Sequence, residues 1–265
     1  MDQVEEWQNR PLKKFYTFVF VDCMYVTIRR EYETKSCAVY VILGYDVNGI
    51  KDILGLWISE SEGKHNWMQI FDELKTRGVE DVLFISMDGV SGLEDGAKSI
   101  FKDVVVQRCI VHLIRNSIKY VPSKDYKVFT AQLKKIYGAP SLKAAEAEFE
   151  RFKQAWSGYP GAVDVWVRNW QHVAQLFNYG SAVRKVMYTT NAIESVNSSF
   201  RKVTKKEPSR AKMLFSSSFI CVLPNCTKNG TTVLLLTGLL SEISLLWMMP
   251  FRKESSSTII YDISL

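Results

Sequence analysis

Residues 15–28, FYTFVFVDCMYVTI, restrict the possible folds of this chain more than any other segment. They are rich in aromatic and β-branched side chains, which favour a β-strand. Two shorter segments of the same character, 37–43 and 53–58, follow after polar breaks. The second break, 46–49, ends in Asn-Gly, the pair that favours a tight hairpin turn. We therefore expect three successive strands, the last two of them antiparallel neighbours.

The next segments alternate between helix and strand. Residues 66–77 place apolar side chains at helical spacing, and 81–87 form an apolar run that ends at Asp88-Gly89. A short helix is expected at 93–101 and a further strand at 104–106. The order β-β-β-α-β-α-β predicts an α/β fold, a mixed sheet with helices packed on it, as in RNase H-like proteins.

The composition and periodicity of the sequence change twice after this region, which predicts that the chain has four segments. Residues 108–180 carry long helical patterns and resemble an all-helical insertion, whose tryptophans we expect in helical packing, with stacking on an unpaired base as the alternative. After residue 206 the sequence has few charges, serine runs and no clear period. The expected units are 1–107, a sheet domain's first part; 108–180, the insertion; 181–206, a further helix of the sheet domain; and 207–265, an atypical tail, out of frame or disordered.

Charge and cysteine usage narrow the class of protein only slightly. The net charge of +6, from 34 basic and 28 acidic residues, suits a polyanionic partner without requiring one. Five irregularly spaced cysteines in a chain of 265 residues favour reduced thiols. The N-terminus lacks the apolar stretch of a secretory signal, and the most apolar run, 233–249, is shorter than a membrane span and contains a glutamate. A cytoplasmic, nucleoid-associated protein is expected.

Asp22 lies inside an apolar strand, where a buried and unpaired carboxylate would cost several kcal/mol. An ion pair with Arg29 or Arg30 is one way to compensate it. Asp88 closes another apolar strand, where it could simply form a turn or cap a helix. The expected topology puts these two strands side by side, which brings both carboxylates to one end of the sheet.

Neighbouring carboxylates suit Mg²⁺ or Mn²⁺, and two such ions can promote an in-line displacement at phosphorus. A third carboxylate would complete the site, and the best candidate is Glu194. It begins an expected helix on which Glu194, Asn197 and Arg201 repeat along one face, although a glutamate there can also be part of a helix cap.

Four segments together resemble the mutator-type bacterial insertion-sequence transposases: VDCMYVTIR, SMDGVSGLEDG, QRCIVHLIRN and TTNAIESVNSSFRKVTKK. The resemblance covers residues 7–206. It implies an RNase H-like fold and a DDE active site of Asp22, Asp88 and Glu194, with a helical insertion between the last two. It also implies DNA cleavage and strand transfer with two Mg²⁺ or Mn²⁺ ions, and DNA, at transposon ends and target, as the partner of a homo-oligomeric full-length protein.

Further residues near these segments are expected to support the site. Cys109 and His112 match a Cys-x-x-His element of that family, and core packing is the alternative for both. A lone Cys/His pair is a weak zinc motif, because structural zinc needs four ligands. The basic residues that flank the motifs could neutralise DNA phosphates, with solvated surface charge as the alternative. They are Arg108, Arg115, Arg201, Lys202, Lys205 and Lys206.

The sequence also departs from the family pattern at both ends. Only about twenty residues precede the first aspartate, and the pattern gives way at Glu207. These departures predict a truncated copy that is frameshifted after about residue 206 and has at most weak activity. A non-catalytic relic that binds DNA or full-length transposase and inhibits it is one alternative. A different RNase H-like nuclease, acting on branched DNA or RNA-DNA hybrids, is another.

Overall fold

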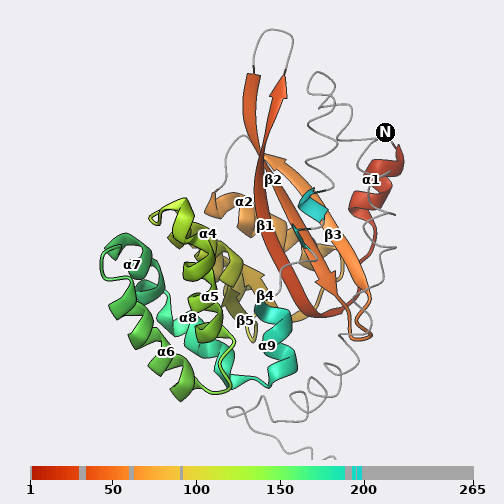
Figure 1. Cartoon of the computed structure of the whole chain (residues 1–265). Coiled ribbons are helices and arrows are strands. Elements are labelled where there is room, and N and C mark those ends of the chain that lie inside the picture. The colour runs from red at the N-terminus through yellow and green to blue at the C-terminus, as the bar shows by residue number, and fades with distance from the viewer. Residues whose placement is uncertain are drawn as a thin grey trace, which may run out of the picture.

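One five-stranded mixed sheet organises the part of the chain that the computed structural model describes, residues 2–29, 34–59, 63–89, 92–188, 193–194 and 196–198 (Figure 1). The strands, in spatial order, are β3 (Lys51–Ser59), β2 (Thr34–Tyr45), β1 (Phe15–Arg29), β4 (Asp81–Met87) and β5 (Val105–Arg108). β1, β2 and β3 pair antiparallel, whereas β1, β4 and β5 run parallel. The predicted mixed sheet is confirmed, including the adjacency of the first and fourth strands.

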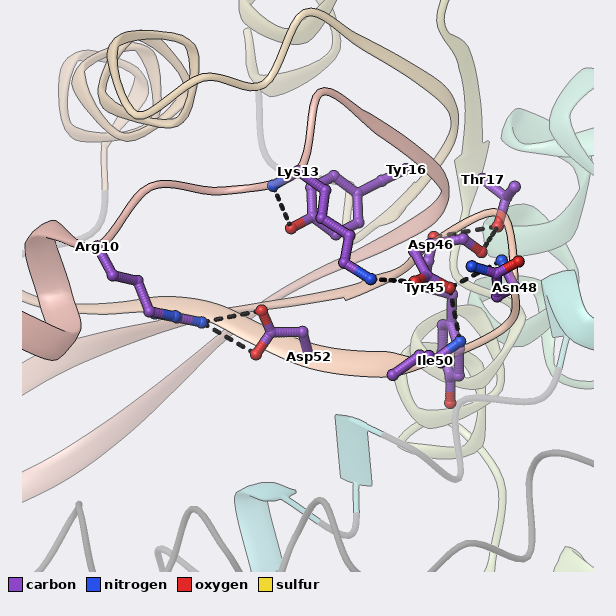
Figure 2. A network of polar contacts seen from close by, with 9 residues as sticks. All are labelled: Arg10, Lys13, Tyr16, Thr17, Tyr45, Asp46, Asn48, Ile50 and Asp52. Atoms are coloured by element: carbon purple, nitrogen blue, oxygen red, sulfur yellow. Dashed lines mark hydrogen bonds and ion pairs between the residues drawn. The ribbon is translucent and has the colours of Figure 1, made fainter.

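The turn between β2 and β3 is built as the Asn-Gly pair predicts. Gly49 has a φ of 73°, a left-handed conformation that glycine adopts without strain. The carboxylate of Asp46 accepts hydrogen bonds from the backbone N–H groups of Asn48 (2.9 Å) and Ile50 (2.7 Å), which fixes the turn from inside. Asp46 is buried and also forms an ion pair with Lys13, so the turn is tied to the segment that precedes β1 (Figure 2).

Two further contacts anchor the chain here, one before β1 and one within its first residues (Figure 2). Arg10 follows α1 (Asp2–Asn9), and its guanidinium donates to both carboxylate oxygens of Asp52, at 2.9 and 3.0 Å. The hydroxyl of Thr17 donates to the carbonyls of Tyr45 (3.0 Å) and Asp46 (3.2 Å). These contacts hold the start of β1 against the β2–β3 hairpin, which fixes the strand that carries Asp22.

Two helices cover one face of the sheet. They are α2 (Lys64–Thr76) and α3 (Leu93–Ile100). The helical spacing of Trp67, Ile70, Phe71 and Leu74 places all four on the buried side of α2, where they pack against alternate residues of β1 and β2. Gly78, with a φ of 106°, follows the end of α2, as the sequence predicts.

The other face is covered by the helices that follow β5 (Figure 1). They are α4 (Ile110–Ile118), α5 (Tyr126–Tyr137), α6 (Leu142–Ala155), α7 (Pro160–Arg168), α8 (Trp170–Gln175) and α9 (Ser181–Tyr188), with short 3₁₀ turns at Ser123–Asp125 and Leu176–Asn178. Side chains of these helices form one apolar core with the remaining alternate residues of the sheet.

The tryptophans of this helical region serve packing. Trp166 is fully buried, and its Nε1 donates to the hydroxyl of Ser117 at 3.1 Å. Trp170 stacks on Phe149 with ring centroids 4.2 Å apart. The alternative of a tryptophan that stacks on an unpaired base is wrong for Trp166, because its ring is not accessible.

The C-terminal part of the chain, from residue 199 onward, lies outside the described residues. The sequence there suggests an atypical tail over 207–265, and that remains a prediction. Within the part of the chain that the structure describes, no helix combines the length and the apolar character needed to cross a membrane.

Candidate active site

Asp22 and Asp88 are brought together by the parallel pairing of β1 and β4. Phe20 pairs with Ser86, Asp22 lies two residues further along β1, and Asp88 directly follows the last residue of β4. The pairing thus brings both aspartates to the same end of the sheet. They line one small cavity together with Trp67 of α2.

The carboxylate of Asp22 is held by three groups from different parts of the chain. One oxygen accepts a hydrogen bond from the backbone N–H of Cys23 (2.9 Å) and lies 3.6 Å from Nε2 of His112. The other oxygen accepts from the side-chain amide of Asn197. The side chains of Arg29 and Arg30, the arginines considered as alternative partners, lie outside the described part of the chain, so that pairing stays a prediction.

Asp22 is only 8 % exposed, and this burial raises the pKa of its carboxyl above the ordinary value. His112, the Cys23 N–H and Asn197 act in the opposite direction, and the negative charge of Asp88 raises the pKa further. Two like charges so close together repel each other, and a bound cation would relieve that repulsion.

Asp88 lies at the end of β4 and is fixed mainly through its backbone. Its carboxylate accepts from the N–H of Gly89 at 2.6 Å, and its carbonyl accepts from the guanidinium of Arg108 at 3.3 Å. A β-carbon at position 89 would lie 3.0 Å from that guanidinium. Glycine after the aspartate therefore leaves room for Arg108, which also pairs with Glu94 at 3.4 Å.

Cys109 and His112 lie at the start of α4, beside Asp22. The N–H of Cys109 donates to the carbonyl of Met87 at 2.9 Å, which attaches the helix to the end of β4. Burial raises the pKa of the Cys109 thiol to about 12, so a thiolate is strongly disfavoured there. The position of His112 fits a supporting role next to Asp22, whereas Cys109 is a buried neutral thiol.

Glu194 faces the same region from the 193–198 segment. Its carboxylate forms an ion pair with Arg115 of α4. Both residues line a narrow cavity that also contains Asp22 and His112. In the described part of the chain, no group of three or more His, Cys, Asp or Glu side chains is close enough together to hold a metal ion. The structure thus places Glu194 on the wall of the Asp22 cavity, engaged with an arginine.

The remaining predicted residues divide into two groups. Asn197 is in contact with Asp22, and Arg108 and Arg115 flank the aspartates, as described above. The other basic residues lie outside the described part of the chain: Arg201, Lys202, Lys205 and Lys206.

Sequence reasoning missed a polar surface next to Asp88. Asn116, Arg168 and Asn169 line a groove there together with Asp88. Asn116 follows the buried Leu113 at helical spacing, a weak signal that it shares a side of α4, but nothing in the sequence indicates that α7 lies opposite.

Comparison with known proteins places the chain in a family. The model of the family "Transposase, Mutator family" matches residues 1–210. The chain is 42 % identical over 207 residues to a probable transposase for the insertion sequence element ISRM3-like of Sinorhizobium fredii, and 41 % identical over 207 residues to the transposase for insertion sequence element ISRM3 of Rhizobium meliloti. Each of these matches covers 77 % of this chain and 52 % of the relative.

A more distant relative is a probable transposase for an insertion sequence element of Corynebacterium diphtheriae. It is 37 % identical over 207 residues, which are 77 % of this chain and 60 % of that protein. The chain spans about half the length of the first two relatives. The match covers both aspartates, Glu194 and the helices between them. The chain therefore belongs to the Mutator family of transposases.

Proposed function

We propose that this chain carries the active site of a DDE transposase, which cleaves DNA at the ends of an insertion sequence and transfers the strands to target DNA. Asp22, Asp88 and Glu194 are the catalytic acids, on an RNase H-like sheet with a helical insertion at 108–180. The observation that supports the proposal is the pairing of β1 with β4, which brings Asp22 and Asp88 to one end of the sheet, where both line one cavity.

The aspartates fit a divalent metal ion. Both offer hard oxygen ligands, the class that Mg²⁺ and Mn²⁺ prefer, and the burial of Asp22 next to Asp88 favours a cation between them. A bound pair of such ions would activate the attacking oxygen and stabilise the leaving oxygen at the phosphorus. Glu194 fits the role of third ligand only after its ion pair with Arg115 opens.

The residues around the aspartates orient them for this task. Asn197 and the N–H of Cys23 fix both oxygens of Asp22, and Arg108 holds the backbone of Asp88. Such contacts keep a ligand within the narrow geometric range that a metal site needs.

DNA is the partner that the basic residues suit. Arg108 contacts the backbone of Asp88, Arg115 lines the cavity of Asp22, and the two arginines are paired with Glu94 and Glu194. A phosphate could replace either glutamate, because guanidinium groups bind both anions through the same donors. Arg201, Lys202, Lys205 and Lys206 are proposed to contact the DNA backbone, and the full-length protein is proposed to act as a homo-oligomer.

A nicking assay on duplex DNA tests the function. The chain is expected to nick DNA weakly in Mn²⁺ and not in EDTA. Asp88→Asn should reduce nicking to background, because the amide loses the negative charge that a metal ligand supplies. Asp103→Asn makes the same change at an exposed carboxylate and should leave nicking intact. Nicking that survives Asp88→Asn or chelation would contradict the proposal.

A second candidate function is that of a non-catalytic relic that binds DNA or full-length transposase and inhibits it. The observation in its favour is the ion pair that keeps Glu194 on Arg115. A calorimetric titration with Mn²⁺ separates the two candidates. Binding that disappears in Asp88→Asn supports the enzyme, and absence of binding in the wild type supports the relic.

A further inference from the structure

A groove of about 400 Å³ opens beside Asp88. Its walls are α4 and α7, which pack against each other in the helical region (Figure 1). Asp88 and Gly89 also line it, so the groove adjoins the second aspartate.

Two arginines line the groove, together with the carboxylate of Asp88. Arg108 lies near Asp88, and Arg168 lies at the C-terminal end of α7. The side chain of Arg168 is 68 % exposed and its only ion pair in the described part of the chain is with Asp164 on the same helix, at 3.6 Å. An exposed pair of this kind contributes little free energy, so the guanidinium is available to an incoming anion.

Two asparagines in the groove each use one of the two polar groups of their side-chain amide in a hydrogen bond. The side-chain oxygen of Asn116 accepts from Lys119 at 3.0 Å, and the side-chain nitrogen of Asn169 donates to the carbonyl of Val165 at 2.8 Å. Within the described residues, the amide N–H₂ of Asn116 and the amide oxygen of Asn169 make no hydrogen bond. A donor and an acceptor in one groove match the mixed edge that a nucleobase presents.

Between these polar groups the groove has an aliphatic lining, Leu113 from α4 and Val165 from α7. Apolar walls with a few polar groups and a volume of this size are typical of sites for a small organic group. A base within a duplex is stacked and paired on its inner edge, and cannot enter such a groove without leaving the stack.

We propose that this groove binds an unpaired nucleotide of the DNA strand that flanks the phosphodiester held at Asp22 and Asp88. The base lies against Leu113 and Val165, the asparagine amides contact its edge, and Arg168 contacts the phosphate on its far side. The proposal rests on the proposed function, because it takes the position of the scissile phosphate from the two aspartates.

Fluorescence anisotropy in EDTA tests the proposal without cleavage. The probes are a DNA duplex with a short single-stranded overhang and the same duplex with blunt ends. The wild type should prefer the overhang. Arg168→Gln should weaken overhang binding by about threefold to tenfold and reduce the salt dependence by roughly one phosphate contact.

Arg151→Gln is the matched control. Arg151 is also an exposed helical arginine, paired with Glu148 on its own helix, and it lies outside the groove. Its substitution should change overhang binding by less than about twofold, the size of a general charge effect. Equal effects of the two substitutions would overturn the proposal, as would equal binding of overhang and blunt DNA by the wild type.

Base preference gives a second, independent measurement. With each of the four bases placed in the overhang, the wild type should discriminate among them, and Asn116→Ala should reduce the differences in affinity. The nicking assay keeps the two proposals apart. Overhang preference without Asp88-dependent nicking contradicts only the proposed function, whereas Asp88-dependent nicking without overhang preference contradicts only the groove.

Discussion

Asp22 lies on β1 and Asp88 directly follows the neighbouring strand β4, whereas Glu194 lies outside the sheet and is linked to the site by side-chain contacts. The positions of the aspartates follow from the pairing of β1 with β4 and from the buried residues on both faces of the sheet. The segment with Glu194 is linked to the site by the Asn197–Asp22 hydrogen bond and the Arg115–Glu194 ion pair, together with the buried side chains of Ile193 and Val196.

The two arrangements differ in the free energy that is needed to change them. Moving an aspartate means breaking the strand pairing and the core. Moving the carboxylate of Glu194 means breaking an ion pair whose side chains are 48 % and 35 % exposed, which is worth no more than about 1 kcal/mol. The proposed site thus has two ligands set by the fold and a third whose position is adjustable, as expected if the site is completed only when DNA or metal arrives.

The largest effect is expected from Phe84→Ala in β4. Phe84 is buried, stacks on Phe18 of β1 at 4.8 Å between ring centroids, and meets Tyr179 edge-on at 5.0 Å. Loss of the ring should reduce the free energy of unfolding by about 3 to 5 kcal/mol, from lost burial and the cavity left behind. Urea denaturation measures this loss.

Val167→Ala is the control for that experiment. Val167 is 46 % exposed on α7, so its truncation should change stability by less than about 0.5 kcal/mol. If Phe84→Ala costs as little as this control, the aspartates are not positioned by a rigid β1–β4 core, and the contrast with Glu194 disappears.

A smaller effect, of opposite sign, is expected from Asp22→Asn in metal-free protein at pH 7. Burial raises the pKa of Asp22, so the ionised carboxylate destabilises the fold there. The introduced amide removes this charge. The buried side-chain oxygen of Asn197 has no partner among the described residues. If the Asn197 amide rotates by half a turn, this oxygen can accept a hydrogen bond from the introduced amide. A gain on the order of 1 kcal/mol, equivalent to about 3 °C in Tm, is expected.

The pH dependence of that gain is its test. A raised pKa means that the wild-type fold gains stability from the protonated carboxyl at low pH and loses it as the pH rises through the folded-state pKa. The advantage of Asp22→Asn should therefore be largest at pH 7 in EDTA and shrink towards pH 4. Asp103→Asn, at an exposed carboxylate, should show no such trend. A gain that is independent of pH would mean that the charge of Asp22 is not the cause.

The part of the site set by the sheet is also the part that the sequence predicts. Local composition is enough to place the strands, since β-branched and aromatic residues favour pleated surfaces, and the order of elements makes β1 and β4 neighbours. The register that pairs Phe20 with Ser86 is not predictable, because parallel register depends on how the intervening helix packs on the sheet.

The contacts between distant side chains are what the sequence leaves open. Arg115 and Glu194 are 79 positions apart, and surface residues of either charge have many possible partners. Arg115 is expected from the sequence to contact DNA, and the structure pairs it with Glu194. The groove between α4 and α7 is not predictable from the sequence for the same reason. Helical periodicity predicts which side of each helix is buried, but it does not predict which helices face each other.

The smallest effect is expected where the third ligand meets its arginine, in Arg115→Gln without DNA. If Arg115 competes with a metal ion for Glu194, removing the guanidinium should raise the affinity for Mn²⁺ by about twofold to fivefold, the range that an exposed ion pair supports. Isothermal titration calorimetry measures this change in Mn²⁺ affinity.

Arg151→Gln opens a comparable pair with Glu148 and should leave Mn²⁺ affinity unchanged. Adding Glu194→Gln to Arg115→Gln should cancel the gain, because the amide has no charge to offer the ion. Unchanged or weaker Mn²⁺ binding in Arg115→Gln would show that Glu194 is not held back by its arginine, and the third ligand would then be as fixed as the other two.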